Sequence, residues 1–255
     1  MNGEIFIEER GSGPSVVLLH GVPTSPEDFG PLVHALARDH RVLVPHLPGY
    51  GRTPIDPTPY SLAGVVARLE ERLGRAGASG GAFVAVSGGA YKALAVALGG
   101  RLEVTRLVLI SPAVGFDPPV AKAYREMVSA VRSGAFDPRA TWLERMASPG
   151  LERRDPQGAA RVLSWLDAAP MSLVCDELAA LADAADLRPR VAELQSPLLV
   201  CTGTADHAVP PSWSKALAES SPRGLFVPVE GAGHALFVEA PERAVRVIAD
   251  FLGDR

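Results

Sequence analysis

Short apolar runs recur along the chain and predict buried β-strands. The first stretch, EIFIEER at 4–10, alternates apolar and polar residues like a half-exposed strand, and SVVLLHG at 15–21 is a continuous apolar run. With the turn GSGP between them, these stretches predict a hairpin that enters a sheet. Similar runs predict further strands at 41–45, 81–87, 106–111, 197–203 and 224–230.

Helical patterns separate most of these runs. The pattern predicts helices at 27–38, 61–73, 90–99, 212–220 and 241–252, with Pro241 at a favourable first-turn position in the last. Buried strands that alternate with helices are typical of a parallel sheet covered on both faces. The predicted fold class is therefore α/β, with a doubly wound, mostly parallel sheet.

One segment, 115–190, interrupts the alternation. Its helical stretches are VAKAYREMVSAVRS, ATWLERMA, PQGAARVLSWLDAA and MSLVCDELAALADAA, and it has no strand-like run. It lies between two strands whose carboxyl ends belong to the side of the sheet where α/β proteins bind ligands. We therefore predict an α/β core formed by 1–114 and 191–255, and a helical cap at 115–190 that covers a ligand site.

The composition narrows the kinds of partner. The 255 residues are 47% hydrophobic, and the net charge is −4 without a basic run, so neither nucleic acid nor an anionic membrane is expected as a partner. Cys175 and Cys201 are too few for a disulfide scaffold and are expected to be buried thiols. Acidic residues near the N-terminus and the lack of any apolar run of about 18 residues predict a cytoplasmic protein.

Ser87 stands in AVSGG, between a predicted buried strand and a predicted helix. Ala85 and Gly89, two residues before and after it, are small, as a close crossing of strand and helix requires. A serine at such a corner exposes its hydroxyl and is typical of a nucleophile elbow, although glycine is more usual than alanine at the first small position. The structural alternative is a glycine-rich turn whose serine caps the helix.

A serine hydroxyl needs a base to take its proton. His234, in GAGHALF after the last predicted strand, is the candidate base, because the glycines flanking Ala232 let this loop turn sharply. Asp206, shortly after the strand PLLVC, is the candidate acid that orients the imidazole. Taken singly, the stretch around His234 favours a solvated loop histidine, and a turn aspartate is the alternative for Asp206. The order Ser, Asp, His at three strand ends favours a catalytic triad.

Two backbone N–H groups are candidates for an oxyanion hole. Gly88 offers one at the start of the predicted helix, and Val22 offers the other in the loop HGVPTSPEDF. His20, in the same loop, is predicted to stiffen it by hydrogen bonding. A second base beside these donors would duplicate His234.

With these motifs in place, the sequence resembles the α/β-hydrolase fold superfamily. The resemblance rests on EERGSGPSVVLLHGVP, VPHLPGYGRT, AVSGGAYKAL, LLVCTGTADHAVP and VEGAGHALFVEAPE. It implies an eight-stranded sheet with a helical cap, the roles of nucleophile, acid and base for Ser87, Asp206 and His234, and no cofactor or metal. The nearest group is that of small bacterial esterases, enol-lactonases and carbon–carbon bond hydrolases. His46 departs from a common aspartate, and Gly88 from a frequently bulkier residue.

The cap has a generic composition, so the resemblance assigns no pocket within it. Tyr124, Met127, Trp142 and Trp165 are candidate walls for an apolar substrate group, although such side chains at helical spacing are more often core.

These observations predict a serine hydrolase that cleaves a carboxylic ester or lactone of a small, largely apolar molecule through an acyl-enzyme. Two alternatives stay open. One is a carbon–carbon bond hydrolase or lyase that uses the same triad, and the other is a receptor-like protein whose triad is weak or vestigial. The chain is expected to act as a monomer or homodimer.

Overall fold

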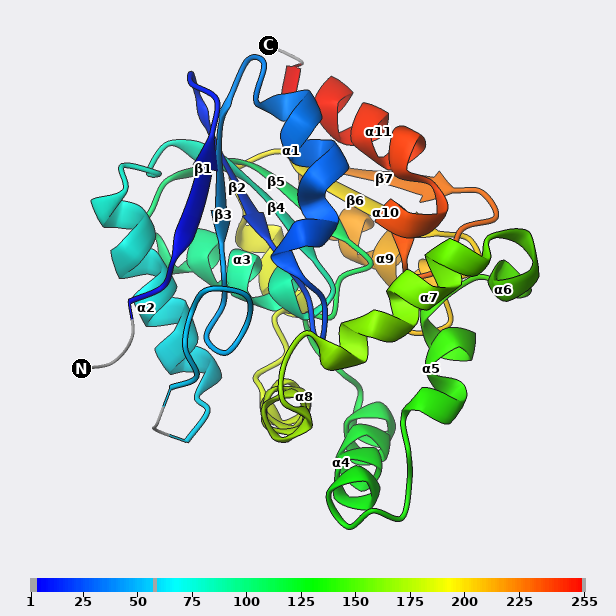
Figure 1. Cartoon of the computed structure of the whole chain (residues 1–255). Coiled ribbons are helices and arrows are strands. Elements are labelled where there is room, and N and C mark those ends of the chain that lie inside the picture. Colours follow the sequence, from blue (N-terminus) through cyan, green and yellow to red (C-terminus); the bar gives the residue numbers. More distant parts are fainter. Residues whose placement is uncertain (1–3, 57–58, 254–255) are drawn as a thin grey trace.

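The computed structural model describes residues 4–56 and 59–253. At its centre is a sheet with the strand order β1-β3-β2-β4-β5-β6-β7 (Figure 1). β1 pairs with β3 in antiparallel fashion, and all other neighbours are parallel. The strands are β1 (Ile7–Arg10), β2 (Ser15–Leu19), β3 (Arg41–Pro45), β4 (Gly81–Val86), β5 (Val104–Ile110), β6 (Leu198–Gly203) and β7 (Gly224–Val229). The mostly parallel α/β class is confirmed, but the described residues form seven strands where eight were predicted.

Helices cover both faces of this sheet. α1 (Gly30–Leu36) and α11 (Pro241–Gly253) pack on one face. α2 (Leu62–Arg75), α3 (Gly88–Gly99) and α9 (Pro211–Glu219) pack on the other. α11 begins at Pro241, as predicted, because the fixed φ of proline suits the first helical position.

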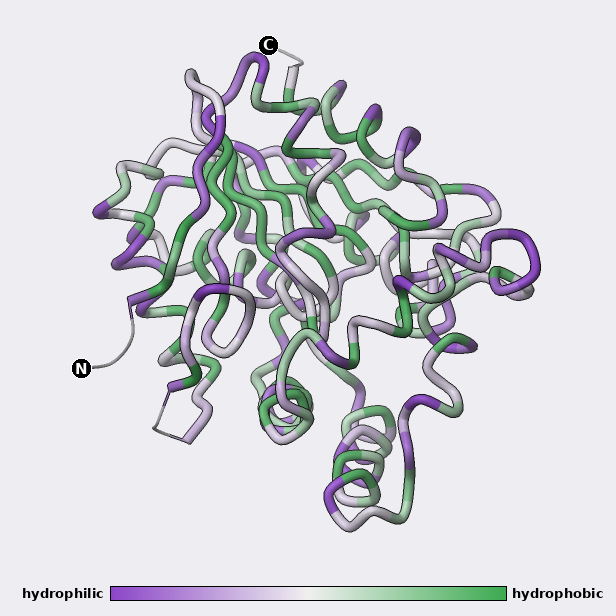
Figure 2. Tube along the Cα trace, viewed as in Figure 1, coloured by the Kyte–Doolittle hydropathy of each residue, from purple (hydrophilic) through white to green (hydrophobic). Residues whose placement is uncertain are grey.

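The continuous apolar runs follow from this layering. Side chains alternate between the two faces of a strand, and in β2 both sets are buried. Val17 and Leu19 join the apolar cluster beneath α2 and α3, whereas Val16 and Leu18 join the cluster beneath α1 and α11. Figure 2 shows the central strands as hydrophobic along their length.

The predicted hairpin between the first two strands is wrong, because β3 lies between them. The crossover through α1 returns the chain beside β2, and β1 then pairs with the outer edge of β3. The connection between β1 and β2 passes tightly under the end of α1. Gly11 has a φ of 74° there, and a Cβ atom on it would lie 2.3 Å from the carbonyl oxygen of His40.

The chain between β5 and β6 forms a group of helices on one side of the sheet (Figure 1), called the cap helices below. They are α4 (Pro118–Arg132), α5 (Arg139–Met146), α6 (Leu151–Arg154), α7 (Pro156–Ser164) and α8 (Met171–Asp183). Trp142, Met146 and Val162 belong to an apolar cluster of their own, whereas Val174 and Leu181 of α8 pack into the main core.

Shorter elements complete the chain. They are the 3-10 helices η1 (Pro26–Phe29), η2 (Trp165–Asp167) and η3 (Arg188–Glu193), and the single-turn helix α10 (Leu236–Glu239). Within residues 4–56 and 59–253, none of the helices combines the length and hydrophobicity needed to cross a lipid bilayer.

Candidate active site

Ser87 occupies the corner between β4 and α3. Its φ of 50° and ψ of −122° lie in a region that side-chain-bearing residues rarely adopt. Its backbone is held on both sides, because the Ser87 N–H donates to the carbonyl of Ile110 at 2.9 Å and the Ser87 carbonyl accepts from Ala90 at 2.9 Å. Its hydroxyl makes no cap bond to α3, unlike the structural alternative considered from the sequence. The corner therefore presents the serine side chain and fixes its direction.

Glycines on either side let neighbouring chain segments approach this corner. A Cβ atom on Gly89 would lie 2.4 Å from the carbonyl oxygen of His20, so α3 passes directly beside the end of β2. A Cβ atom on Gly21 would lie 3.0 Å from the Cβ atom of Ser87. Ala85 is completely buried in β4. The small residues noted around Ser87 thus lie at close backbone crossings.

Asp206 and His234 lie together, although 28 positions separate them in sequence. The Nδ1 atom of His234 is 3.0 Å from Oδ2 and 3.2 Å from Oδ1 of Asp206. Oδ1 also accepts backbone N–H bonds from Ala208 at 2.9 Å and Val209 at 2.8 Å. Burial acts to raise the pKa of Asp206, but the charge and hydrogen bond of His234 and the Val209 N–H outweigh it, so this pKa lies below its usual value. The acid stays ionised and orients the ring.

Ser87 and His234 line the same pocket. Within the described residues no hydrogen bond joins the Ser87 hydroxyl to the imidazole, and such bonds often tighten only when substrate binds. Because Asp206 holds Nδ1, the Nε2 atom of His234 is the nitrogen left for proton transfer.

Val22 and Gly88 line the same pocket. Gly88 is the first residue of α3, where an N–H group has no partner within the helix. A Cβ atom on Gly88 would lie 3.0 Å from Cγ2 of Val22 and 2.9 Å from Cδ1 of Leu181. Val22 and the cap helix α8 thus fill the space that a bulkier residue at position 88 would take.

His20 and His46 make structural bonds. The Nε2 atom of His20 accepts the Leu47 N–H at 3.1 Å, so Nδ1 carries the proton toward the Gly21 carbonyl at 3.0 Å. Complete burial lowers the pKa of His20 to about 3, which keeps this ring neutral. The Nδ1 atom of His46 accepts the Arg52 N–H at 3.0 Å, and burial lowers its pKa as well. Both rings therefore organise the loops beside the site.

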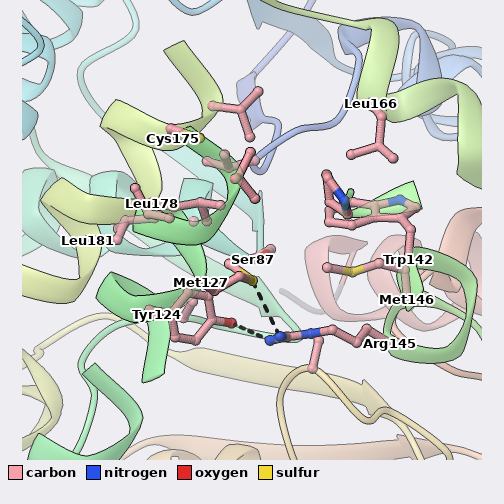
Figure 3. Close-up of a pocket in the computed structure, with 18 of the residues that line it drawn as sticks. Ser87, Tyr124, Met127, Trp142, Arg145, Met146, Leu166, Cys175, Leu178 and Leu181 are labelled. Carbon is pink, nitrogen blue, oxygen red and sulfur yellow. Dashed lines mark hydrogen bonds between the residues drawn. The ribbon is translucent and has the colours of Figure 1, made fainter. Parts of the chain in front are cut away.

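The pocket above Ser87 is walled mainly by cap helices (Figure 3). Tyr124 and Met127 from α4 and Trp142 from α5 line it. Trp165 does not line this pocket: it belongs to the apolar cluster of the cap helices and borders a separate small cavity that His234 also touches.

The two cysteines are free and buried, as predicted. Cys175 lines the pocket from α8, and burial raises its pKa. Cys201 lies inside β6, where burial raises its pKa to about 12, so its thiol stays protonated.

Sequence reasoning missed a buried ion pair beside the elbow. Lys92 in α3 is completely buried, and its Nζ lies 2.5 Å from Oε1 of Glu177 in α8. Tyr50 and Tyr60 also donate to this carboxylate, at 3.0 and 3.2 Å. The available signal was the single charge of Lys92 in the otherwise apolar helix GGAYKALAVALG, because a buried charge requires a partner.

Sequence reasoning also missed two residues that connect the cap helices with the site. Arg145 of α5 lines the pocket. Glu239 accepts the N–H of Gly233, next to His234, at 3.0 Å and the N–H of Ser148, in the cap, at 2.9 Å. Arg145 stands in no motif. Glu239 lies within VEGAGHALFVEAPE, but nothing in that stretch indicates that its carboxylate contacts the cap helices.

A mostly parallel sheet with a strained serine between strand and helix, and with an aspartate–histidine pair in the loops after β6 and β7, defines an α/β-hydrolase fold. Residues 16–247 match the sequence model of the alpha/beta hydrolase family, and the chain belongs to this family.

Its relatives include named esterases. The pimeloyl-[acyl-carrier protein] methyl ester esterase of Xanthomonas campestris is 28% identical over 97% of this chain and 98% of that protein. The polyketide synthase ThaQ of Burkholderia thailandensis is 31% identical over 94% of this chain, which spans only 12% of the length of that synthase.

Two solved structures are similar to this chain over nearly its whole length. A thermophilic esterase from Thermogutta terrifontis superposes with a TM-score of 0.89 at 25% identity, over 98% of this chain and 93% of that one. The enol-lactonase from Burkholderia xenovorans superposes with a TM-score of 0.87 over 99% of this chain and 97% of that one. At 22% identity, the second likeness shows the fold alone.

Proposed function

We propose that the protein hydrolyses a carboxylic ester or lactone by way of an acyl-enzyme formed on Ser87. The observation that carries this proposal is the pairing of His234 with Asp206 at the edge of the pocket that Ser87 lines. The two esterase relatives support ester hydrolysis over the carbon–carbon bond cleavage and the receptor role that the sequence left open.

In the proposed mechanism, the Ser87 hydroxyl attacks the carbonyl carbon while Nε2 of His234 takes its proton. Asp206 fixes the ring through Nδ1 and stabilises the imidazolium that forms. The tetrahedral oxygen accepts the N–H groups of Val22 and Gly88. When the intermediate collapses, the alcohol leaves with the proton from His234.

Deacylation repeats these steps with water. His234 takes a proton from water, the hydroxide attacks the acyl carbon, and the carboxylic acid leaves as Ser87 regains its proton. The mechanism uses the chain's own residues, with no cofactor and no metal.

The proposal extends to the arrangement of the chain. Residues 1–114 and 191–255 act as the hydrolase core, and the helical segment 115–190 acts as a cap that shapes the pocket. Tyr124, Met127 and Trp142 would contact the apolar part of the substrate, since they line the pocket that Ser87 also lines.

The test is to replace Ser87 with alanine and measure hydrolysis of short-chain esters. We expect Ser87→Ala to lower kcat on the order of 10³-fold or more, because the nucleophile is lost while the fold is kept. Ser133→Ala is the matched control, since Ser133 is exposed and its hydroxyl bonds only the nearby carbonyl of Ala130. Near-normal activity of Ser87→Ala would remove Ser87 as the nucleophile.

Covalent labelling separates an enzyme from a receptor with an inactive triad. An organophosphonate should add one phosphonyl group to Ser87 of the native chain, seen as a mass increase, and none to Ser87→Ala. A chain that binds esters but never reacts with the phosphonate would favour the receptor alternative.

A further inference from the structure

The pocket above Ser87 contains an isolated positive charge. Its lining in the described residues is dominated by apolar side chains, and Arg145 is the only lysine or arginine, aspartate or glutamate among them. Figure 3 shows this side chain reaching from α5 toward Tyr124 and Met127 of α4. The guanidinium therefore belongs to the pocket wall that a substrate would meet.

The partners of Arg145 are neutral. One guanidinium nitrogen donates to the Tyr124 hydroxyl at 3.2 Å and another lies 3.7 Å from Sδ of Met127. The guanidinium also lies 5.4 Å from the centre of the Tyr124 ring. A guanidinium has five N–H donors, and thioether sulfur is a weak acceptor. These contacts aim the group and leave most of its donors for a ligand.

Several other arginines of the cap helices have acidic partners. Arg125 pairs with Asp183, Arg139 with Asp167, and Arg161 of α7 with Asp28 of the core. Within the described residues, no aspartate or glutamate lies within ion-pair distance of Arg145. These three arginines are exposed, whereas Arg145 is partly buried in the pocket wall. Arg153 and Arg154 of α6 also have no acidic partner among the described residues, but water solvates both of them.

A positive charge in an apolar cavity is unfavourable unless an anion joins it. A carboxylate matches the planar fork of a guanidinium and accepts two parallel N–H bonds. The rest of the pocket offers apolar contact for a hydrocarbon chain. The pocket therefore suits a molecule that has a carboxylate at one position, an apolar chain, and a scissile carbonyl at Ser87.

We propose that the substrate is an ester or lactone that carries a separate carboxylate, and that Arg145 binds this carboxylate while Tyr124 holds the guanidinium in place. The proposal rests on the proposed function, because it assigns the substrate class of the same site. Arg145 is then a specificity-determining residue and Tyr124 a positioning residue.

The first experiment compares two substrates with the same carbon chain. These are the half-methyl ester of a straight-chain dicarboxylic acid and its dimethyl ester, with chain length varied in parallel. We expect the native enzyme to favour the half-ester in kcat/KM on the order of 10-fold to 100-fold, the range for hydrogen bonds to charged groups. Arg145→Met should remove most of this ratio, mainly through KM of the half-ester, and Arg145→Lys should lie between.

Arg139→Met is the matched control. Arg139 also lies in α5 but is exposed, pairs with Asp167 and does not line the pocket, so this variant should keep the preference. Equal kcat/KM values for both esters in the native enzyme, or the same preference in Arg145→Met, would overturn the proposal and leave ester hydrolysis standing.

A binding measurement decides the question independently of turnover. In the Ser87→Ala background, calorimetric titration should show tighter binding of the half-ester than of the dimethyl ester, and adding Arg145→Met should remove the difference. If the native chain hydrolyses neither ester but this binding difference is found, the hydrolase proposal fails while the carboxylate subsite stands. Equal binding of the two esters to Ser87→Ala would overturn the subsite.

Discussion

At the scale of single residues, the candidate site depends on the strained backbone of Ser87 and on the missing Cβ atom of Gly89. A positive φ at a residue with a side chain costs of the order of 1–3 kcal/mol, and the hydrogen bonds of Ser87 with Ile110 and Ala90 hold it there. The corner also requires β2 to pass beside the first turn of α3, which is possible because Gly89 has no Cβ.

Replacing Gly89 with alanine therefore tests the corner. The new Cβ would meet the backbone oxygens of His20 and Leu19 at 2.4 and 2.7 Å, so main chain has to move and we expect a loss of about 2 kcal/mol or more in the free energy of unfolding. Activity should fall as well, because the same shift displaces Ser87. Urea unfolding followed by circular dichroism gives the free energy.

The control for this prediction is Gly30→Ala. Gly30 begins α1 with a φ of −44°, and a Cβ atom there meets nothing within 4 Å, so alanine should leave stability unchanged or raise it slightly. If Gly89→Ala proved as stable as Gly30→Ala, the close crossing beside Ser87 would not be a constraint.

The sequence could indicate the position of a candidate residue where that residue stands in a local pattern. Ser87, Asp206 and His234 each follow a recognisable strand, so their approximate meeting place could be predicted. The sequence does not mark Arg145 as a candidate site residue. Its place in the site depends on the hydrogen bond to Tyr124, 21 positions away on another helix, and on the lack of a nearby acidic partner among the described residues. Such features are properties of packing and leave no periodic signal.

At the scale of elements, α3 and α8 are joined by a buried polar cluster. Lys92 bonds Glu177 and also donates to the carbonyl of Gly88 at 3.3 Å, at the first turn of α3. Glu177 in turn accepts from Tyr50 and Tyr60. Burial is the main reason that the pKa of Tyr50 is raised well above its usual value, with the charge of Glu177 adding to it, so its hydroxyl stays a donor. This cluster links a cap helix to the residue beside the nucleophile.

Breaking this pair from one side should be costly. Lys92→Met leaves the Glu177 carboxylate buried without its cation, and we expect a loss of roughly 3–5 kcal/mol in the free energy of unfolding. Glu177→Gln should lower the free energy of unfolding by a similar amount, because it leaves the Lys92 ammonium buried without its anion. The double variant Lys92→Met, Glu177→Gln should lose less than the sum of the two single losses, because it leaves no lone charge.

An exposed ion pair provides the comparison. Lys122 and Glu126 on α4 lie 3.6 Å apart and are largely exposed, so Lys122→Met should change stability by less than about 1 kcal/mol. Additive losses for Lys92 and Glu177 in chemical denaturation would show that the two groups do not act as a pair.

The edge of the sheet shows why the pairing partner of β1 was predicted wrongly. The pattern of 4–10 correctly indicated a strand, yet its partner is β3, not the next strand in sequence. Periodicity identifies a strand and its buried face, whereas pairing depends on where the α1 crossover places the chain. The choice between hairpin and crossover neighbour was not encoded in the alternation of apolar and polar residues.

At the scale of the whole molecule, the loop that carries His234 is bonded to the cap on both sides of the histidine. The Glu239 carboxylate bridges the N–H groups of Gly233 and Ser148, and also accepts the Ser148 hydroxyl. The Ala235 N–H donates to the carbonyl of Met146 at 2.8 Å. The contact is close, since a Cβ atom on Gly233 would lie 2.4 Å from the nitrogen of Ser148. The position of the cap and that of the candidate base are therefore coupled.

Glu239→Gln tests this coupling, because one carboxylate oxygen becomes an amide NH₂, which cannot accept, so the N–H of either Gly233 or Ser148 loses its acceptor. If Glu239 positions His234, kcat for ester hydrolysis should fall by about 10-fold or more with a smaller change in KM, since misplacement of a catalytic group slows the chemical step. Glu242→Gln, in the exposed first turn of α11, should leave both constants unchanged. A lower melting temperature of Glu239→Gln with an unchanged kcat would instead make Glu239 a purely structural link between core and cap.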